Sequence, residues 1–335
     1  MTRARTILVG IYSRFAAWNI PASYVERLRE LFPGYRFLHA QSDQEALANI
    51  PDADVAFMSE VRPEHLAAAR QLKWIHCPAA GVTGMLFPAM IESPVVMSNS
   101  RGISADTIAE HVVAVTLVMF RKLPLVLARQ ADQTWALDAV LADPPLRTIA
   151  GSEVLMIGLG AIGMATARRM SALKARVTAI RRRPEGSPPD FVERSGGPEN
   201  LLDFLPTADV VVLAAPQTRE TARLIGAREL AAMRRDSLLV NVSRGSLIDE
   251  SALVAALSLP LPDRTIGAAA LDVFDREPLP PESPLWRLPG VLITPHMAGF
   301  RADHWNAVTG LFADNLRHFE AGQPLLNVVD KEAGY

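Results

Sequence analysis

The chain contains 335 residues, of which 49% are hydrophobic and 21% are charged, a composition typical of a soluble globular protein with two domains. Its formal net charge is −2, which argues against binding to nucleic acid or a membrane surface, because neither polyanion would attract it. The single cysteine, Cys77, excludes an internal disulfide, and together with the lack of a signal-like segment it predicts a cytoplasmic protein.

Segments of strand and helix character alternate from the start of the chain, a pattern that predicts parallel sheets covered by helices. Strands are expected at Thr6–Ile11, Asp54–Met58 and Leu72–His76, and helices at Tyr24–Leu31 and Pro63–Gln71. These elements predict a small α/β domain in the first part of the chain.

A long helix is expected over Ala105–Arg121, with Ser104 as its N-cap and Asp106 in its first turn. Between Val112 and Phe120 the segment is apolar on nearly every face, which predicts that the helix is buried. This apolar stretch is too short to span a bilayer.

Three glycines, Gly158, Gly160 and Gly163, follow the strand-like run Glu153–Ile157 and open a helical segment. This order suits a dinucleotide pyrophosphate. Gly158 permits a tight turn, Gly160 lets the backbone approach phosphate, and Gly163 lets the helix pack closely on the strand. The start of the helix then offers backbone N–H groups to the anion. The alternative is a glycine-rich turn that binds nothing.

Strand-like and helical segments continue beyond the glycines, and a final helix is expected at Ala302–Glu320. The later strands are expected at Arg176–Ile180, Val210–Ala214, Leu238–Val242, Thr265–Leu271 and Val291–Thr294. The sequence therefore predicts an α/β protein of two Rossmann-like domains with parallel sheets. The NAD(P)-binding domain, residues 102–296, is inserted into a discontinuous substrate domain made of residues 1–101 and 297–335.

Three polar segments come just after predicted strands, where doubly wound folds place their sites. Arg244, beside a glycine, has the geometry to grip a carboxylate through two donors. Glu277 precedes a proline, and His296 follows a strand and a Thr-Pro pair. Taken singly, each has an ordinary alternative: a surface arginine, a solvated loop carboxylate and a satisfied core histidine.

In this order behind the glycine motif, the three segments make the chain resemble the D-isomer-specific 2-hydroxyacid dehydrogenase family. The resemblance covers most of the chain and supports the predicted two-domain layout. Further segments that carry it are Ala80-Gly81-Val82, Ile108-Ala109-Glu110-His111, Gln130 with Trp135, Pro216-Gln217-Thr218 with Thr221, Asn315-Leu316 and Leu326-Asn327-Val328-Val329.

The resemblance implies a role for each residue of the trio. Arg244 would hold the substrate carboxylate and carbonyl, and His296 would protonate the carbonyl oxygen as hydride arrives. Glu277 would hydrogen-bond the imidazole and favour its protonated form. The backbone of Ala80, Gly81 and Val82 would bind the carboxylate from the other domain. The chemistry needs no metal. The residues implied in cofactor binding are Gly158, Leu159, Gly160, Ala161, Ile162, Gly163, Arg181, Arg182, Arg183, Ala215, Pro216, Thr221, Val242, Ser243, Asp272 (at the nicotinamide carboxamide), His296, Ala298 and Gly299.

The chain departs from the family's NAD-binding pattern at the cofactor ribose. NAD-binding members place an acid about 20 residues after the glycines. Here Arg181, Arg182 and Arg183 occupy that place, and no Asp or Glu occurs between Gly163 and Arg183. Basic side chains suit a 2′-phosphate, so NADP(H) is expected to be preferred over NAD(H). A solvated basic loop is the alternative.

The basic ribose loop and the short C-terminus make the chain resemble most the glyoxylate/hydroxypyruvate reductase branch, which reduces small 2-oxoacids with NADPH. Two alternatives stay open: an NAD(P)-sensing binding protein of co-repressor type, and an NAD-dependent dehydrogenase for a bulkier 2-hydroxyacid. The resemblance also implies a homodimer formed through about Leu123 to Thr148, in which Trp135 is an interface anchor, a pocket residue or a core residue.

Overall fold

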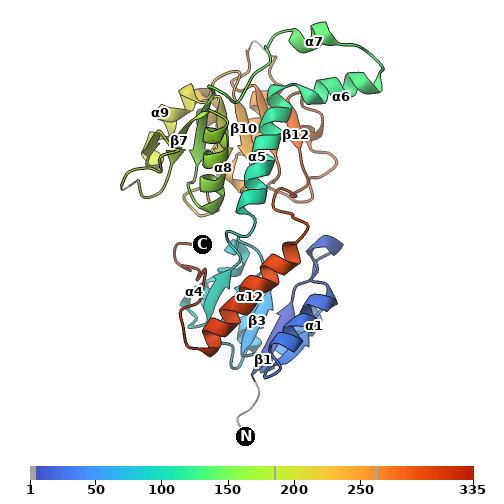
Figure 1. Ribbon diagram of the computed structural model, residues 1–335, viewed down its shortest axis with the longest axis vertical. Helices are drawn as coiled ribbons and strands as arrows, with labels where there is room; N and C mark the ends of the chain where they lie inside the picture. The colour runs from blue at the N-terminus through green and yellow to red at the C-terminus, as the bar shows by residue number, and fades with distance from the viewer. Residues whose placement is uncertain (1–4, 185, 261–262) are drawn as a thin grey trace. The chain divides into compact units, whose positions relative to one another are not determined.

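The structure is a computed structural model that describes residues 5–184, 186–260 and 263–335. It divides into two compact units, one made of Met1–Ile103 with Arg301–Tyr335 and the other of Ser104–Phe300. Each unit is built on its own parallel sheet with helices on both faces (Figure 1). This confirms the predicted α/β class with two parallel sheets, and the unit boundaries lie close to the predicted domain limits.

The first unit contains a five-stranded sheet in the order β2-β1-β3-β4-β5, in which all the neighbouring strands are parallel. Helices α1 and α12 cover one face, where Phe312 stacks on Phe57 and Trp74, and α2, α3 and α4 cover the other. The elements are β1 Thr6–Gly10, α1 Ala22–Leu31, β2 Arg36–His39, α2 Asp43–Asn49, β3 Val55–Met58, α3 Pro63–Ala68, β4 Trp74–Cys77, α4 Pro88–Glu92, β5 Val96–Asn99 and α12 His304–Glu320.

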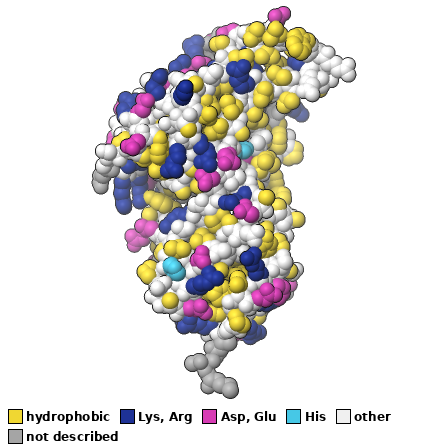
Figure 2. Space-filling model, in the orientation of Figure 1, with side chains coloured by type: hydrophobic (Ala, Val, Ile, Leu, Met, Phe, Trp, Pro, Cys, Tyr) yellow, Lys and Arg dark blue, Asp and Glu magenta, His cyan; other side chains and the backbone are white. Residues whose placement is uncertain are grey.

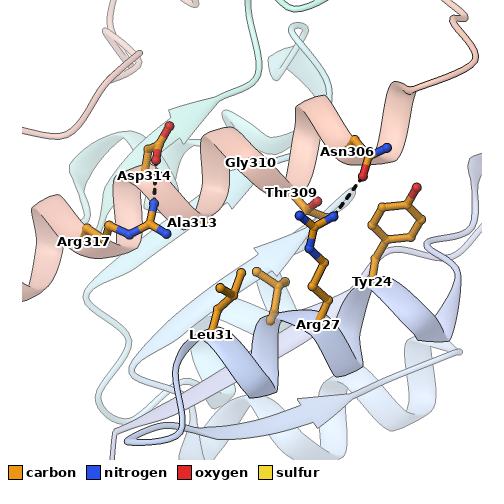
Figure 3. Close-up of a pocket in the computed structure, with 10 residues that line it drawn as sticks. Tyr24, Arg27, Leu31, Asn306, Thr309, Gly310, Ala313, Asp314 and Arg317 are labelled. Carbon is orange, nitrogen blue, oxygen red and sulfur yellow. Dashed lines mark hydrogen bonds and ion pairs between the residues drawn. The ribbon is translucent and has the colours of Figure 1, made fainter.

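A surface groove of about 380 Å³ lies between α1 and α12. Figure 3 shows Arg27 reaching from α1 to Asn306 on α12, where its guanidinium donates to Oδ1 at 3.1 Å. Farther along α12, Arg317 pairs with Asp314 at 2.7 Å. None of the site residues predicted from the sequence lines this groove.

The second unit contains a seven-stranded parallel sheet in the order β12-β11-β10-β9-β6-β7-β8. Helices α5 and α8 pack on one face, and α9, α10 and α11 pack on the other. The elements are α5 Ala105–Phe120, α6 Leu123–Ala131, α7 Leu137–Leu141, β6 Glu153–Ile157, α8 Ala161–Ala172, β7 Arg176–Ile180, β8 Arg194–Gly196, α9 Leu201–Phe204, β9 Val210–Leu213, α10 Ala227–Ala232, β10 Leu238–Asn241, α11 Glu250–Ser258, β11 Ala268–Leu271 and β12 Val291–Ile293.

The order of strands places a topological switch point in this second sheet. From β6 the chain runs outward to β7 and β8, and it then returns to β9 on the other side of β6. Loops that leave β6 and β9 therefore diverge at the carboxyl edge of the sheet, which is where open α/β folds bind ligands.

Helix α5 begins at the predicted residue, and Ser104 stands at the N-cap position as expected. The Ser104 side chain makes no capping hydrogen bond, so Ser104 caps the helix by position alone. Within the described ranges, no single helix is long and apolar enough to span a membrane. Helices α5 and α6 have the required length and apolar composition only when taken together, and they are bent by 64° relative to each other.

Candidate active site

The glycine motif forms a tight turn between β6 and α8. Gly158 has a φ of +98°, and a Cβ on it would lie 2.6 Å from the backbone nitrogen of Ala215. A Cβ on Gly163 would lie 2.0 Å from the carbonyl oxygen of Gly158. Both positions therefore require glycine for reasons internal to the protein.

Gly160 differs from these two glycines, because a Cβ there would meet nothing within 4 Å. The open space lies at the N-cap of α8, where helical N–H groups lack intrahelical acceptors and favour an anion. The residues present therefore fit a dinucleotide pyrophosphate, which needs close approach of the backbone at this position.

Two side chains predicted to bind cofactor also fasten the loop after β9. The hydroxyl of Thr221 donates to the carbonyl of Pro216 at 2.7 Å and accepts the N–H of Thr218 at 2.8 Å. Ser243, at the end of β10, donates to the carbonyl of Ala215. These contacts fix the shape of the loop beside the glycine turn.

The three arginines after β7 have different surroundings. The Arg181 guanidinium donates to the carbonyls of Pro184 at 3.0 Å and Gly186 at 2.8 Å. Arg182 and Arg183 are exposed. Arg181 thus holds the backbone of its own loop, and the two following arginines present positive charge to solvent.

His296 and Glu277 form a close pair, with 2.6 Å between Nδ1 and Oε2. The second oxygen of Glu277 accepts the N–H of Phe274 at 3.0 Å. Burial raises the pKa of the Glu277 carboxyl, but the hydrogen bond and charge of His296, with smaller contributions from Phe274 and Arg244, bring it below its ordinary value. Glu277 is therefore an anion at neutral pH, and its hydrogen bond orients the His296 ring.

The turn that carries His296 is held by one buried carboxylate. Asp272, which follows β11, accepts the backbone N–H groups of Met297 and Ala298, both at 2.9 Å. It also accepts the hydroxyl of Thr294 at 2.6 Å. His296 itself has a φ of 52°, a left-handed conformation that costs a non-glycine residue about 1–2 kcal/mol. The contacts to Asp272 stabilise that conformation.

Arg244 lies at the end of β10 and is positioned through its backbone. The side chain of Asn241 donates to the Arg244 carbonyl at 2.9 Å, and the guanidinium of Arg244 donates to the Ser243 carbonyl at 2.7 Å. A Cβ on Gly245 would lie 1.9 Å from the carbonyl carbon of Phe274. Glycine at 245 therefore allows the segment after β10 to pack against the segment that leads to Glu277.

Ala80, Gly81 and Val82 lie in the first unit, in the loop that follows β4. Ala80 and Gly81 are exposed, whereas Val82 is buried. The remaining predicted residues lie in the second unit, after the carboxyl ends of β6, β7, β9, β10, β11 and β12.

Three residues of this site were not singled out from the sequence: Asn241, Gly245 and Thr294. Each of them is close in sequence to a predicted residue. Asn241 could have been found from the sequence, because it is a polar residue at the end of an apolar strand. The role of each residue comes from a contact with a neighbouring strand or loop, and the order of residues along the chain does not show which strands and loops are neighbours.

Comparisons with known proteins agree with this geometry. Residues 113–298 match the model of the D-isomer specific 2-hydroxyacid dehydrogenase NAD binding domain. The chain is 31% identical to a glycerate dehydrogenase of Methylorubrum extorquens, over 86% of this chain and 88% of the relative.

Solved structures give the same result. A D-isomer specific 2-hydroxyacid dehydrogenase from Xanthobacter autotrophicus, in complex with NADPH and MES, superposes with a TM-score of 0.83 at 28% identity, covering 99% of this chain and 100% of the other. An NADPH-dependent glyoxylate/hydroxypyruvate reductase from Sinorhizobium meliloti, in complex with NADP and sulfate, gives a TM-score of 0.83 at 26% identity with the same coverage.

Proposed function

The chain belongs to the D-isomer-specific 2-hydroxyacid dehydrogenase family, and we propose that it reduces a small 2-oxoacid of the glyoxylate/hydroxypyruvate type to the D-2-hydroxyacid with NADPH. It is thus an NAD(P)-dependent oxidoreductase. The observation that carries the proposal is the 2.6 Å pair of His296 and Glu277, which lies near enough to Arg244 for that charge to lower the pKa of Glu277.

The proposed roles follow from the chemistry of each side chain. Arg244 binds the substrate carboxylate and carbonyl through its planar fork of donors. His296, protonated on both ring nitrogens, gives its Nε2 proton to the carbonyl oxygen, and Glu277 stabilises the imidazolium before the transfer. NADPH, when bound, supplies the hydride that adds to the carbonyl carbon. Asp272 keeps His296 in place through the turn that it binds.

The cofactor is proposed to bind over the turn between β6 and α8 and along the carboxyl edge of the second sheet. Its pyrophosphate takes the open space beside Gly160, and Arg182 and Arg183 pair with the 2′-phosphate. Arg181 supports them by holding the loop. Two similar solved structures are complexes with NADPH or NADP, which supports this choice of cofactor.

A panel of 2-oxoacids assayed with NADPH and with NADH tests the function. We expect glyoxylate and hydroxypyruvate to be reduced, with kcat/KM at least about tenfold higher for NADPH, because hydrogen bonds to a charged group contribute about 1.5–3 kcal/mol each. Activity confined to phenylpyruvate-like acids, or equal use of the two cofactors, would refute the branch assignment. Binding of NADPH without turnover of any 2-oxoacid would favour a sensing protein.

Substitutions of Arg182 and Arg183 in the loop after β7 test whether their charges bind the 2′-phosphate of the cofactor. The double variant Arg182→Ser with Arg183→Ser should lose most of the preference for NADPH while kcat/KM with NADH stays within about twofold of wild type. Arg287→Ser is the control, because it removes another exposed arginine of the same unit. An equal loss with both cofactors in the double variant would indicate a damaged loop instead.

The family resemblance and the surface of the second unit together support a homodimer. The segment with α6 and α7 extends away from the sheet in Figure 1 and buries none of its helical residues. Leu127 and Trp135 are 63% and 93% exposed, and Figure 2 shows hydrophobic side chains at the top of the molecule near α7. Trp135 is therefore not a core residue, and a second copy is the proposed occupant of this surface.

Light scattering measures the proposed association. Wild-type protein should have the mass of a dimer, and Leu127→Glu with Trp135→Glu should give a folded monomer, since charges would have to be buried on association. A monomeric wild type at micromolar concentration would rule out the dimer.

A further inference from the structure

The loop after β4 is tied back to the end of β5 at two successive carbonyl groups. The side-chain amide of Asn99 donates to the Ala80 carbonyl at 2.6 Å, and the backbone N–H of Ser100 donates to the Ala79 carbonyl at 3.2 Å. Asn99 is only 1% exposed, whereas Ala80 is exposed. A buried residue therefore sets the orientation of peptide groups at the surface.

Peptide geometry then fixes the direction of the next two N–H groups. In a planar trans peptide, the carbonyl of one residue and the N–H of the following residue point in opposite directions. Because the carbonyls of Ala79 and Ala80 face the end of β5, the N–H groups of Ala80 and Gly81 point away from it. Within the part of the chain that the structure describes, neither N–H donates to a protein acceptor. Two such donors form a site for one carboxylate.

The end of β5 is itself held by a chain of hydrogen bonds. The Trp74 indole, which can only donate, donates to the Ser98 hydroxyl at 2.8 Å. The same hydroxyl bonds His76 Nδ1 at 2.7 Å, and His76 Nε2 bonds the Ser100 hydroxyl at 3.2 Å.

This chain keeps one arrangement over the working pH range. Burial lowers the pKa of His76 to about 3, so the ring stays neutral and keeps its bonds to Ser98 and Ser100. Side chains alternate along a strand, which places Ser98 and Ser100 on the side of His76 and leaves Asn99 facing the loop. The strand end that carries Asn99 is thereby rigid.

We propose that Asn99 is a positioning residue for the substrate carboxylate: by binding the Ala80 carbonyl, it aims the Gly81 N–H at the 2-oxoacid. This inference rests on the proposed function, and it adds a side chain that does not touch the substrate. The substrate class is a short 2-oxoacid whose carboxylate is held by backbone donors of this loop.

The test compares Asn99→Asp and Asn99→Ala with wild type, using oxamate as an unreactive 2-oxoacid analogue. Asp has the size of Asn but no amide donor, so the Ala80 peptide loses its tether. We expect the oxamate Kd, measured by calorimetry on the enzyme–NADPH complex, and the KM for glyoxylate to rise about 10- to 100-fold, the range for one hydrogen bond to a charged group. The Kd for NADPH and kcat should change less than threefold.

Asn315→Ala is the matched control in the same unit. The buried Asn315 side chain also bonds backbone, donating to and accepting from Leu326, and among the described residues these bonds do not involve the loop after β4. This control should lower Tm at least as much as the Asn99 variants and leave the oxamate Kd within twofold of wild type.

Oxamate binding at wild-type affinity in both folded Asn99 variants would overturn the inference while leaving the proposed function intact. An equal loss of oxamate affinity in Asn315→Ala would overturn it too, because the loss would then reflect stability alone. If wild type neither bound oxamate nor reduced any 2-oxoacid, the proposed function itself would be wrong and the role of Asn99 would fall with it.

Discussion

Removal of the His296 imidazole should lower kcat for 2-oxoacid reduction by about 10²- to 10⁴-fold, the usual contribution of a general acid. The ring is paired with Glu277 at 2.6 Å, an arrangement that fixes the orientation of the ring for the proposed proton transfer. His296 has a φ of 52°, so His296→Asn is the sharper variant, because asparagine tolerates the left-handed region better than alanine does. Stopped-flow measurement of NADPH oxidation gives the rate of the chemical step.

The Kd for NADPH should remain within about twofold of wild type in His296→Asn, since the ring is proposed to act on the substrate carbonyl. His318→Ala, on α12 in the other unit, controls for the loss of a histidine and should have normal kcat. Near-normal kcat in both His296→Asn and His296→Ala would assign the proton to another donor.

The variant Glu277→Gln tests the role of Glu277 in the pair, with kcat for reduction measured as a function of pH. Because its pKa lies below the ordinary value, Glu277 stays ionised as pH falls well below neutral, and reduction should persist at mildly acidic pH. Glu277→Gln removes the negative charge and keeps the shape of the side chain, so kcat for reduction should fall across the whole pH range. An unchanged kcat would contradict the proposed role of Glu277.

Arg244→Lys should lower kcat/KM by about 2–4 kcal/mol, or roughly 30- to 1,000-fold, as expected when a charge pair with a bound substrate is disrupted. One guanidinium nitrogen of Arg244 already donates to the Ser243 carbonyl. The ammonium of lysine is a point charge that cannot make this contact and also present a planar fork to a carboxylate.

Steady-state kinetics with glyoxylate measure this loss. Arg276→Lys, in the exposed segment just before Glu277, is the matched control and should retain wild-type kcat/KM. A normal KM and kcat in Arg244→Lys would remove Arg244 from the substrate site.

The central strands of both sheets are predictable from the sequence, and the three strands that escape prediction are β2, β5 and β8. All three lie at sheet edges, and they are short, with polar residues such as Arg36, Ser98 and Arg194. Central parallel strands are buried on both faces and read as continuous apolar runs, as in Val210–Leu213. An edge strand depends on its single neighbour, so its own residues identify it poorly.

The candidate site, like the sheets, has parts that the sequence predicts and parts that it does not. The spacing of Arg244, Glu277 and His296 along the chain points to the family, and the glycine turn has a local signature. The contacts between Asp272 and Thr294, and between Asn99 and Ala80, join segments that meet only after the sheets have formed. No local pattern encodes such pairings, so only the folded structure reveals them.

The turn around His296 has a consequence for how this enzyme can change over evolutionary time. The carboxylate of Asp272 binds the hydroxyl of Thr294 and the N–H groups of Met297 and Ala298, so three anchors of one catalytic loop depend on a single side chain. Substitutions at positions 272 and 296 should therefore be strongly epistatic: once either residue is lost, losing the other should cost little more. A lineage that loses Asp272 should therefore lose the geometry of the proposed proton donor in a single substitution.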